Sequence, residues 1–313
     1  MGHCRPWKAL RIHRRLCLCL CLCLLVLGML LGSPLWAADV LLTASDDNSS
    51  VRTFTEELAA QRPRDQVRFV PLAQLPPPGQ LPGSTRLILL DPQSLDWRLQ
   101  DPLGPPTLVL RISRLQAQQR LAQSPHPRLS LLWSDPPLER QLRLIRSVLP
   151  QVRRVGVLYS ADSRFLLKEL HLAAQTLNME IIAEPWDSTS DSRPLQNLLR
   201  NSEVLLGLDD PKLYNPKTVK NLLLSSYARQ QALIGPNAGF VRAGSLASTY
   251  SDQQDWLQTL DSLLDQPPAR WPRALYPTAF KVLSNPQVAR SLGIEEIDPQ
   301  AVARQLSEGE KHP

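Results

Sequence analysis

Cysteine is confined to the first 23 residues of this 313-residue chain, at Cys4, Cys17, Cys19, Cys21 and Cys23. Those five alternate with leucine in an apolar run, where a thiol behaves as a small hydrophobic side chain. The rest of the chain therefore has no disulfide, no thiolate nucleophile and no cysteine-based metal site. A chain without cysteine also tolerates an oxidising compartment well.

Histidine is nearly as scarce, and the common catalytic signatures are missing. Beyond the first 37 residues only His126, His171 and His312 occur, and no two of them have the spacing of metal ligands. No G-x-S-x-G turn, phosphate-binding glycine loop, dinucleotide fingerprint or H-E-x-x-H helix appears. A pair of catalytic carboxylates, as in glycosidases, stays an alternative because such a pair leaves no local sequence signature. We expect no catalytic residue, no metal and no cofactor, and therefore a binding protein rather than an enzyme.

Excess charge is also missing once the N-terminus is set aside. Five of the 35 basic residues and none of the 29 acidic residues precede Asp39, so the remainder carries 30 basic against 29 acidic side chains. A near-neutral chain has no electrostatic footprint for nucleic acid or for an acidic membrane surface. The 276 residues that follow position 37 are enough for two lobes, each with its own core.

The N-terminus has the order of a secretory signal peptide. A basic segment is followed by an uncharged apolar run over residues 16–31 and then by Ala37 and Ala38. The run is shorter than the ~20 residues that a spanning helix needs. We expect cleavage after residue 37 and a periplasmic location. An uncleaved anchor is the alternative, since bulky Leu35 stands three residues before the cleavage site.

Apolar runs that alternate with amphipathic segments predict an α/β protein with parallel sheets. The expected strands fall in two series, at 39–45, 67–71, 85–91, 107–113 and 129–133, and then at 154–159, 180–185, 203–209 and 232–235. Continuous rather than alternating apolar runs are typical of strands covered by helices on both faces. The sequence therefore predicts two Rossmann-like lobes with a ligand cleft between them.

Helix signals are clear in most of the second half. A helix is expected over 136–149, and Asn215, Ser251, Asn285 and Asp298 are expected to open four more, the last two short. Gly293 can end the third of these four. Residues 71–83 hold five prolines where a crossover helix would normally lie. Because proline lacks the N–H that a helix requires, we expect a wrapped loop there.

Polar residues gather where the predicted strands end, which is where open α/β sheets bind ligands. Helix starts at some of these positions also favour anionic groups. The alternative for each is a helix cap or turn residue, and Trp186, Trp256 and Trp271 are expected in the core. The residues that we predict to contact a ligand are Ser45, Asp46, Asp91, Trp133, Ser134, Tyr159, Ser160, Asp162, Asp209, Asp210 and Asn237.

From residue 129 onward the chain resembles a known family. The segments R-R-V-G-V-L-Y-S at 153–160, E-V-L-L-G-L-D-D at 203–210, I-G-P-N-A-G-F-V-R-A-G-S-L-A-S at 234–248 and N-P-Q-V-A-R-S-L-G-I at 285–294 are similar to ABC-transporter substrate-binding proteins. The branch is the one that includes binders of aromatic amino acids. Asp91, Pro92 and Gln93 depart from it, because the family tends to have small hydroxyl residues there.

The resemblance implies a type I periplasmic-binding fold with three crossovers. The first lobe is expected over 38–150 with a recrossing helix near 250–270, and the second over 151–249 with 275–306. The expected partners are a small amino-acid-like or organic ligand and a membrane permease, with the protein itself a monomer. One alternative is an accessory protein that signals to a membrane receptor, and another is a hydrolase or isomerase on an α/β fold.

Overall fold

The computed structural model describes residues 38–121 and 128–311. The predicted signal peptide, residues 1–37, lies outside them. None of the helices within the described residues combines the length and the apolar character that a membrane span requires.

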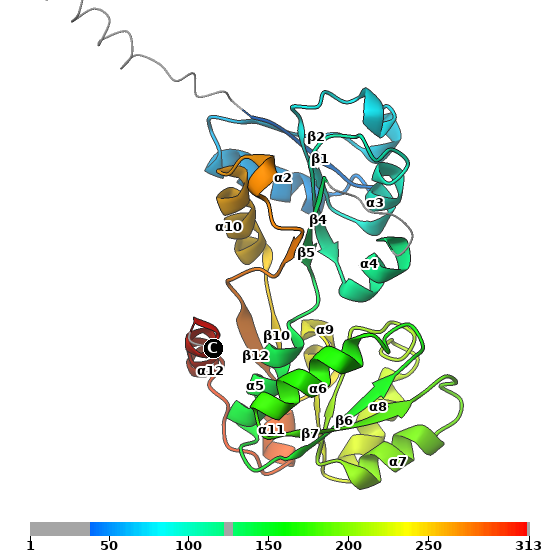
Figure 1. Ribbon diagram of the computed structural model, residues 1–313. Helices are drawn as coiled ribbons and strands as arrows, with labels where there is room; N and C mark the ends of the chain where they lie inside the picture. Colours follow the sequence, from blue (N-terminus) through cyan, green and yellow to red (C-terminus); the bar gives the residue numbers. More distant parts are fainter. Residues whose placement is uncertain (1–37, 122–127, 312–313) are drawn as a thin grey trace, which may run out of the picture. The chain divides into compact units, whose positions relative to one another are not determined.

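The first lobe is built on a six-stranded sheet in which all neighbouring strands are parallel. Its strand order is β11-β5-β4-β3-β1-β2, and Figure 1 labels β1, β2, β4 and β5 of this sheet. The strands are β1 (Asp39–Thr43), β2 (Gln66–Phe69), β3 (Arg86–Leu89), β4 (Thr107–Ile112), β5 (Leu129–Trp133) and β11 (Ala274–Leu275). All five strands predicted for this lobe are confirmed. Four of them, β1, β3, β4 and β5, are mostly buried, as expected of apolar runs covered on both faces. The edge strand β2 is only partly buried. β11 was not predicted.

The helices of the first lobe are α2 (Ser49–Gln61), α3 (Pro92–Arg98), α4 (Arg114–Leu121) and α10 (Gln253–Leu264). No α-helix joins β2 to β3. The proline-rich segment there contains only two 3₁₀ turns, Leu72–Gln74 and Pro78–Gln80. This confirms the predicted loop, since prolines remove the donors that a longer helix would need.

The second lobe repeats the architecture with the strand order β12-β10-β9-β8-β6-β7. Its strands are β6 (Arg154–Tyr159), β7 (Glu180–Pro185), β8 (Val204–Leu206), β9 (Ala232–Ile234), β10 (Ala247–Tyr250) and β12 (Lys281–Ser284). All neighbours are parallel except β10 and β12, which are antiparallel. The four predicted strands are confirmed, and β10 and β12 are additional.

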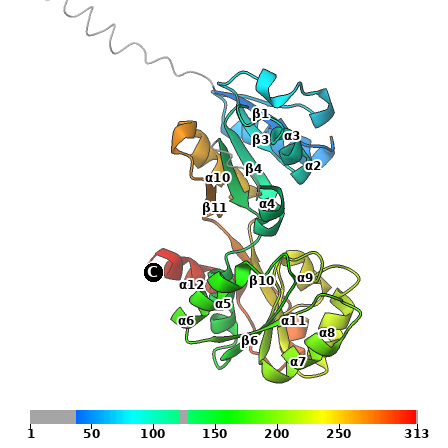
Figure 2. The same cartoon turned by 45° about the vertical axis from the view of Figure 1, so that its right-hand side comes forward.

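Seven helices belong to the second lobe. They are α5 (Leu138–Val148), α6 (Leu166–Thr176), α7 (Arg193–Asn201), α8 (Val219–Tyr227), α9 (Ala238–Ala243), α11 (Pro286–Ser291) and α12 (Pro299–Lys311). Figure 2 shows α12 beside α5, where Arg140 forms an ion pair with Glu310 at 2.6 Å. Asn285 caps α11, as predicted. Asp298 precedes α12 and accepts hydrogen bonds from the N–H groups of Gln300 and Ala301 in its first turn, also as predicted. α12 is longer than predicted.

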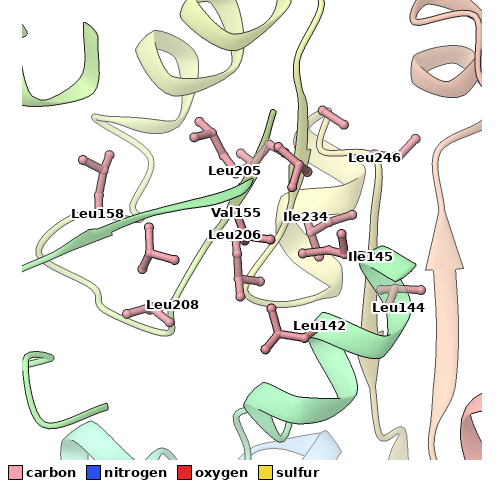
Figure 3. Packing of buried hydrophobic residues seen from close by; sticks show 14 of the residues in the cluster. Leu142, Leu144, Ile145, Val155, Leu158, Leu205, Leu206, Leu208, Ile234 and Leu246 are labelled. Carbon is pink, nitrogen blue, oxygen red and sulfur yellow. The ribbon is translucent and has the colours of Figure 1, made fainter. Parts of the chain in front are cut away.

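The core of the second lobe explains where α5 belongs. The sequence assigned this segment to the first lobe, with the boundary at residue 150. Leu142 and Ile145 of α5 instead pack against Val155 of β6 and Ile234 of β9 (Figure 3). The chain therefore leaves the first lobe between β5 and α5. The three tryptophans expected in the core, Trp186, Trp256 and Trp271, are all less than a tenth exposed.

The chain passes between the lobes three times, between β5 and α5, between β10 and α10, and between β11 and β12. This confirms the three expected crossovers. Figure 1 shows α10 against α2, where Arg62 binds Asp261 at 2.6 Å and Asp265 at 3.0 Å. The capping box of α10 is Asp252 with Asp255, so the predicted cap at Ser251 was one residue early.

Candidate ligand-binding site

Three predicted residues of the first lobe, Ser45, Asp46 and Asp91, lie at the carboxyl ends of β1 and β3. Asp91 joins the two ends, because its carboxylate accepts hydrogen bonds from the Ser45 N–H at 2.5 Å and the Ser45 hydroxyl at 2.9 Å. Its other oxygen caps α3 through the Ser94 N–H at 2.7 Å. Ser45 and Asp91 thus shape the edge of the sheet, and Asp46 beside them is exposed.

In the second lobe, Asp210 was expected on the rim of the cleft. Its side chain is instead buried, at 1 % exposure, behind the loop that follows β6. The carboxylate accepts hydrogen bonds from the hydroxyls of Ser160 and Ser163, both at 2.6 Å, and from the Lys212 N–H at 3.0 Å. Asp210 and Ser160 therefore hold two strand ends together. A ligand contact for either residue stays a prediction.

Two further predicted residues also have local partners. Asn237 caps α9 by accepting a hydrogen bond from the Phe240 N–H at 3.2 Å. Asp162 forms an ion pair with Lys212 at 2.7 Å and accepts a hydrogen bond from Gln119 of the first lobe at 3.1 Å. The Lys212 hydrogen bond is the main reason that the pKa of Asp162 is lowered.

Asp209 lies where the lobes meet. Burial, followed by the nearby charges of Asp135 and Asp210, raises the pKa of Asp209 to about 6, while a hydrogen bond from Ser113 of the first lobe opposes the rise. A carboxyl in such a place can accept hydrogen bonds when ionised and donate one when protonated. Among the predicted ligand-binding residues, Asp209 has the pKa that departs furthest from that of an exposed aspartate.

Arg114, which sequence reasoning missed, links the same region. It binds Asp135 at 2.8 Å and Glu169 of α6 at 2.7 Å, and its side chain is 10 % exposed. Its guanidinium lies 5.9 Å from the centre of the Tyr276 ring. Two buried polar atoms, Arg114 Nη2 and the Tyr276 hydroxyl oxygen, have no hydrogen-bond partner among the described residues. Groups of this kind are rare in proteins and call for a partner.

Trp133, at the end of β5, lines a pocket of about 280 Å³ together with Arg114. Phe165 of the second lobe and the apolar side chains of Ala117 and Leu131 form other parts of its wall. The pocket thus combines aromatic rings with a buried guanidinium. Such a mixture of apolar walls and few polar groups is typical of small-molecule sites.

The other two predicted residues, Ser134 and Tyr159, differ in exposure. Ser134 is exposed, and Tyr159 is half-buried with the Arg164 guanidinium 5.8 Å from its ring centre. Across residues 38–121 and 128–311, no group of three His, Cys, Asp or Glu side chains is placed to hold a metal ion.

A larger cavity, of about 500 Å³, lies away from the strand ends. It is lined by the end of α5, the beginning of α12 and the segment between Ile294 and Asp298. None of the predicted ligand-binding residues reaches it.

No protein-family model matches the chain. No curated protein matches its sequence.

Solved structures do resemble the chain. One is a conserved domain protein from Vibrio cholerae, which is 17% identical over 86% of this chain and 98% of its own, with a TM-score of 0.55. A second is an ABC domain from Streptococcus pneumoniae in complex with L-Trp, 16% identical over 86% and 98%, with a TM-score of 0.55. A third is a ligand-free, open substrate-binding protein with adhesive properties from Clostridium difficile, 13% identical over 84% and 97%, with a TM-score of 0.64. With two six-stranded, mostly parallel sheets joined by three crossings, the chain has the fold of the type I periplasmic binding proteins.

Proposed function

We propose that this protein is an exported solute-binding protein that captures a small molecule between its lobes and delivers it to the permease of an ABC importer. The observation that carries the proposal is the meeting of both lobes at Arg114. There a nine-tenths buried guanidinium with an unpartnered Nη2 borders the pocket that contains Trp133 and Phe165. A ligand could satisfy the free N–H groups and cover the aromatic rings.

The polar groups at this junction suit an amino-acid-like or small organic ligand. Arg114 Nη2 and the Tyr276 hydroxyl can donate hydrogen bonds to an acidic group, whereas Asp209 can accept one from an ammonium or hydroxyl group. The L-Trp bound by the Streptococcus pneumoniae domain of the same fold supports a ligand of this size. We assign the protein no catalytic step.

Three chain crossings between lobes support a hinged closure on the ligand. Residues 1–37 are proposed to direct export to the periplasm and to be removed there. Among the other predicted contacts at the strand ends, Ser45, Asp46 and Ser134 are exposed and Tyr159 is half-buried.

Tryptophan fluorescence and thermal shift together test the proposal. A panel of L-amino acids, 2-oxo acids and sugars should contain at least one compound that raises the melting temperature. At ~100 times its dissociation constant a ligand stabilises by ~2.7 kcal/mol. The same compound should change the fluorescence of the wild-type protein.

Two matched variants identify the tryptophan that produces the fluorescence change. Trp133→Phe should abolish the fluorescence change, because Trp133 lines the pocket. Trp97→Phe is the control, since Trp97 lies in α3 and packs against the core of the first lobe. A panel with no active compound, or a fluorescence change that survives in Trp133→Phe and disappears in Trp97→Phe, would contradict the proposed site.

A further inference from the structure

The cavity of about 500 Å³ in the second lobe lies outside the proposed ligand site. One wall is the end of α5 with the turn that follows it, residues 147–152, and the other is the segment 294–298 with the first turn of α12. Neither Arg114 nor Tyr276 lines it, and none of the predicted ligand-binding residues does. Small-molecule sites commonly have volumes of about 300–1,000 Å³, so this cavity is large enough for a ligand of its own.

The walls of the cavity are mostly apolar and are held in place by the protein core. Six side chains that line the cavity are partly buried and pack against the core of the second lobe: Val148, Leu149, Val152, Ile294, Ile297 and Val302. Because the core already fixes them, a ligand would cover these side chains without first having to order them. The cavity therefore suits a ligand with an apolar body.

The charged side chains that line the cavity are all acidic. They are Glu295, Glu296 and Asp298, and no lysine, arginine or histidine lines it. Both glutamates are exposed, since Ile294 and Ile297 on either side of them pack against the core. Within the part of the chain that the structure describes, neither glutamate has an ion pair or a side-chain hydrogen bond. A cation can therefore reach them without displacing an existing partner.

The beginning of α12 does not make the cavity a site for an anion. Helix N-termini favour anions through their free N–H groups and their dipole. At α12 the Asp298 carboxylate already accepts hydrogen bonds from the N–H groups of Gln300 at 2.9 Å and Ala301 at 3.1 Å. The charge that is left for a ligand is the negative charge of the two glutamates.

We propose that this cavity is a second ligand site, which binds a small organic cation with an apolar body and a protonated amine. The apolar body covers the side chains of the walls, and the ammonium group pairs with Glu295 and Glu296. The inference goes beyond the proposed function and does not depend on it, because the two sites share no lining residue.

A protein partner fits this surface less well than a small molecule does. A stable protein interface covers about 800 Å² on each partner and has an apolar centre. Among the described residues, the large apolar side chains that are exposed are Leu103, Phe165, Leu172 and Leu224. None of these four lines the cavity, so its apolar surface does not continue onto an exposed apolar patch.

Calorimetric titration with three probes that share one apolar body tests the inference. The probes are phenylbutylamine, which is cationic, phenylbutanol, which is neutral, and phenylbutyrate, which is anionic. The amine should bind the wild type about 3- to 10-fold more tightly than the alcohol, because two exposed ion pairs each contribute little. The acid should bind more weakly than the alcohol, since the glutamates repel it.

Three variants then locate the binding. Glu295→Gln combined with Glu296→Gln removes the charge and keeps the shape, so the amine should bind about 3- to 10-fold more weakly and the alcohol unchanged. Glu180→Gln combined with Glu308→Gln is the matched control, since both residues are exposed and neither lines the cavity. Ala301→Phe places a ring in the cavity and should weaken both the amine and the alcohol. All three should melt close to the wild-type temperature.

Several results would overturn the inference. Binding of none of the three probes to the wild type would do so, as would an acid that binds as tightly as the amine. So would an amine that binds the Glu295 and Glu296 variant as tightly as it binds the wild type. A peptide of alternating leucine and lysine that binds more tightly than the amine would identify a protein surface instead. Each of these results leaves the proposed function standing, because its test uses Trp133 in the other pocket.

Discussion

Replacing Asp209 with asparagine should stabilise the protein, and more strongly at high pH. Burial raises the pKa of Asp209 from 3.8 to about 6 in the folded protein. The folded state therefore holds this proton more tightly than the unfolded chain does. Ionising Asp209 costs the folded state free energy, and this cost develops as the pH rises from about 4 to about 6 and stays constant above that. With roughly 2 pKa units at 1.36 kcal/mol each, it is about 3 kcal/mol.

Asparagine removes this cost because it stays neutral, and its side-chain oxygen can still accept the Ser113 hydrogen bond. The gain of Asp209→Asn in unfolding free energy should be about 3 kcal/mol at pH 8. It should be about 1 kcal/mol at pH 4.5, where the folded carboxyl is still mostly protonated and the cost is only that of keeping the proton bound. For a chain of this size that is about 6 °C in melting temperature at pH 8 and about 2 °C at pH 4.5.

The assay is thermal unfolding followed by circular dichroism at both pH values, with Asp187→Asn as the control. Asp187 follows β7 and is exposed, so its replacement should leave the melting temperature within 1–2 °C of wild type at either pH, as roughly expected for surface positions. A gain from Asp209→Asn that does not change with pH, or a loss at pH 8, would refute the electrostatic reasoning.

Two further substitutions test the second lobe. Asp210→Ala should lower the unfolding free energy by about 3 kcal/mol, because it leaves the buried hydroxyl of Ser160 without its acceptor, and chemical denaturation measures the loss. Unchanged stability with weaker ligand binding would instead restore the predicted ligand contact. Gly156→Ala should cost about 1–3 kcal/mol, since the new Cβ would come within 2.5 Å of the Ser202 hydroxyl oxygen. Gly83→Ala, in the first lobe, is the control for Gly156→Ala: its new Cβ would meet no atom within 4 Å, so this variant should melt like the wild type.

The polar side chains at the strand ends show how far sequence reasoning reaches. The carboxyl ends of parallel strands meet at one edge, so Ser45 and Asp91 could be expected close together, and they are in contact. Whether each such residue faces a ligand or satisfies the local backbone depends on side-chain direction. Asp210 turns inward to two serines, and Asn237 caps a short helix. Neither outcome follows from residue type, because aspartate and asparagine serve both roles.

Two arginines near the strand ends were missed for a similar reason. In the run L-V-L-R-I-S-R, Arg111 and Arg114 read as ordinary solvent-facing residues at the end of a strand. A β-bulge in β4 turns Arg111 onto Phe54 and is a property of pairing with β5, and the ion pair of Arg114 with Glu169 joins segments 55 residues apart. Both depend on contacts that no local pattern encodes.

The sequence by itself determined the alternation of strands and helices, nine of the twelve strands and the loop in the proline-rich segment. These follow from local apolar runs and from the missing N–H of proline. Only the tertiary structure decided that α5 packs in the second lobe. The return of α10 to the first lobe was already expected from the family resemblance. The tertiary structure also placed β11 and β12 at the edges of different sheets. Such short elements gain their stability from partners that lie far away in the chain, so their positions become defined only when both sheets have formed.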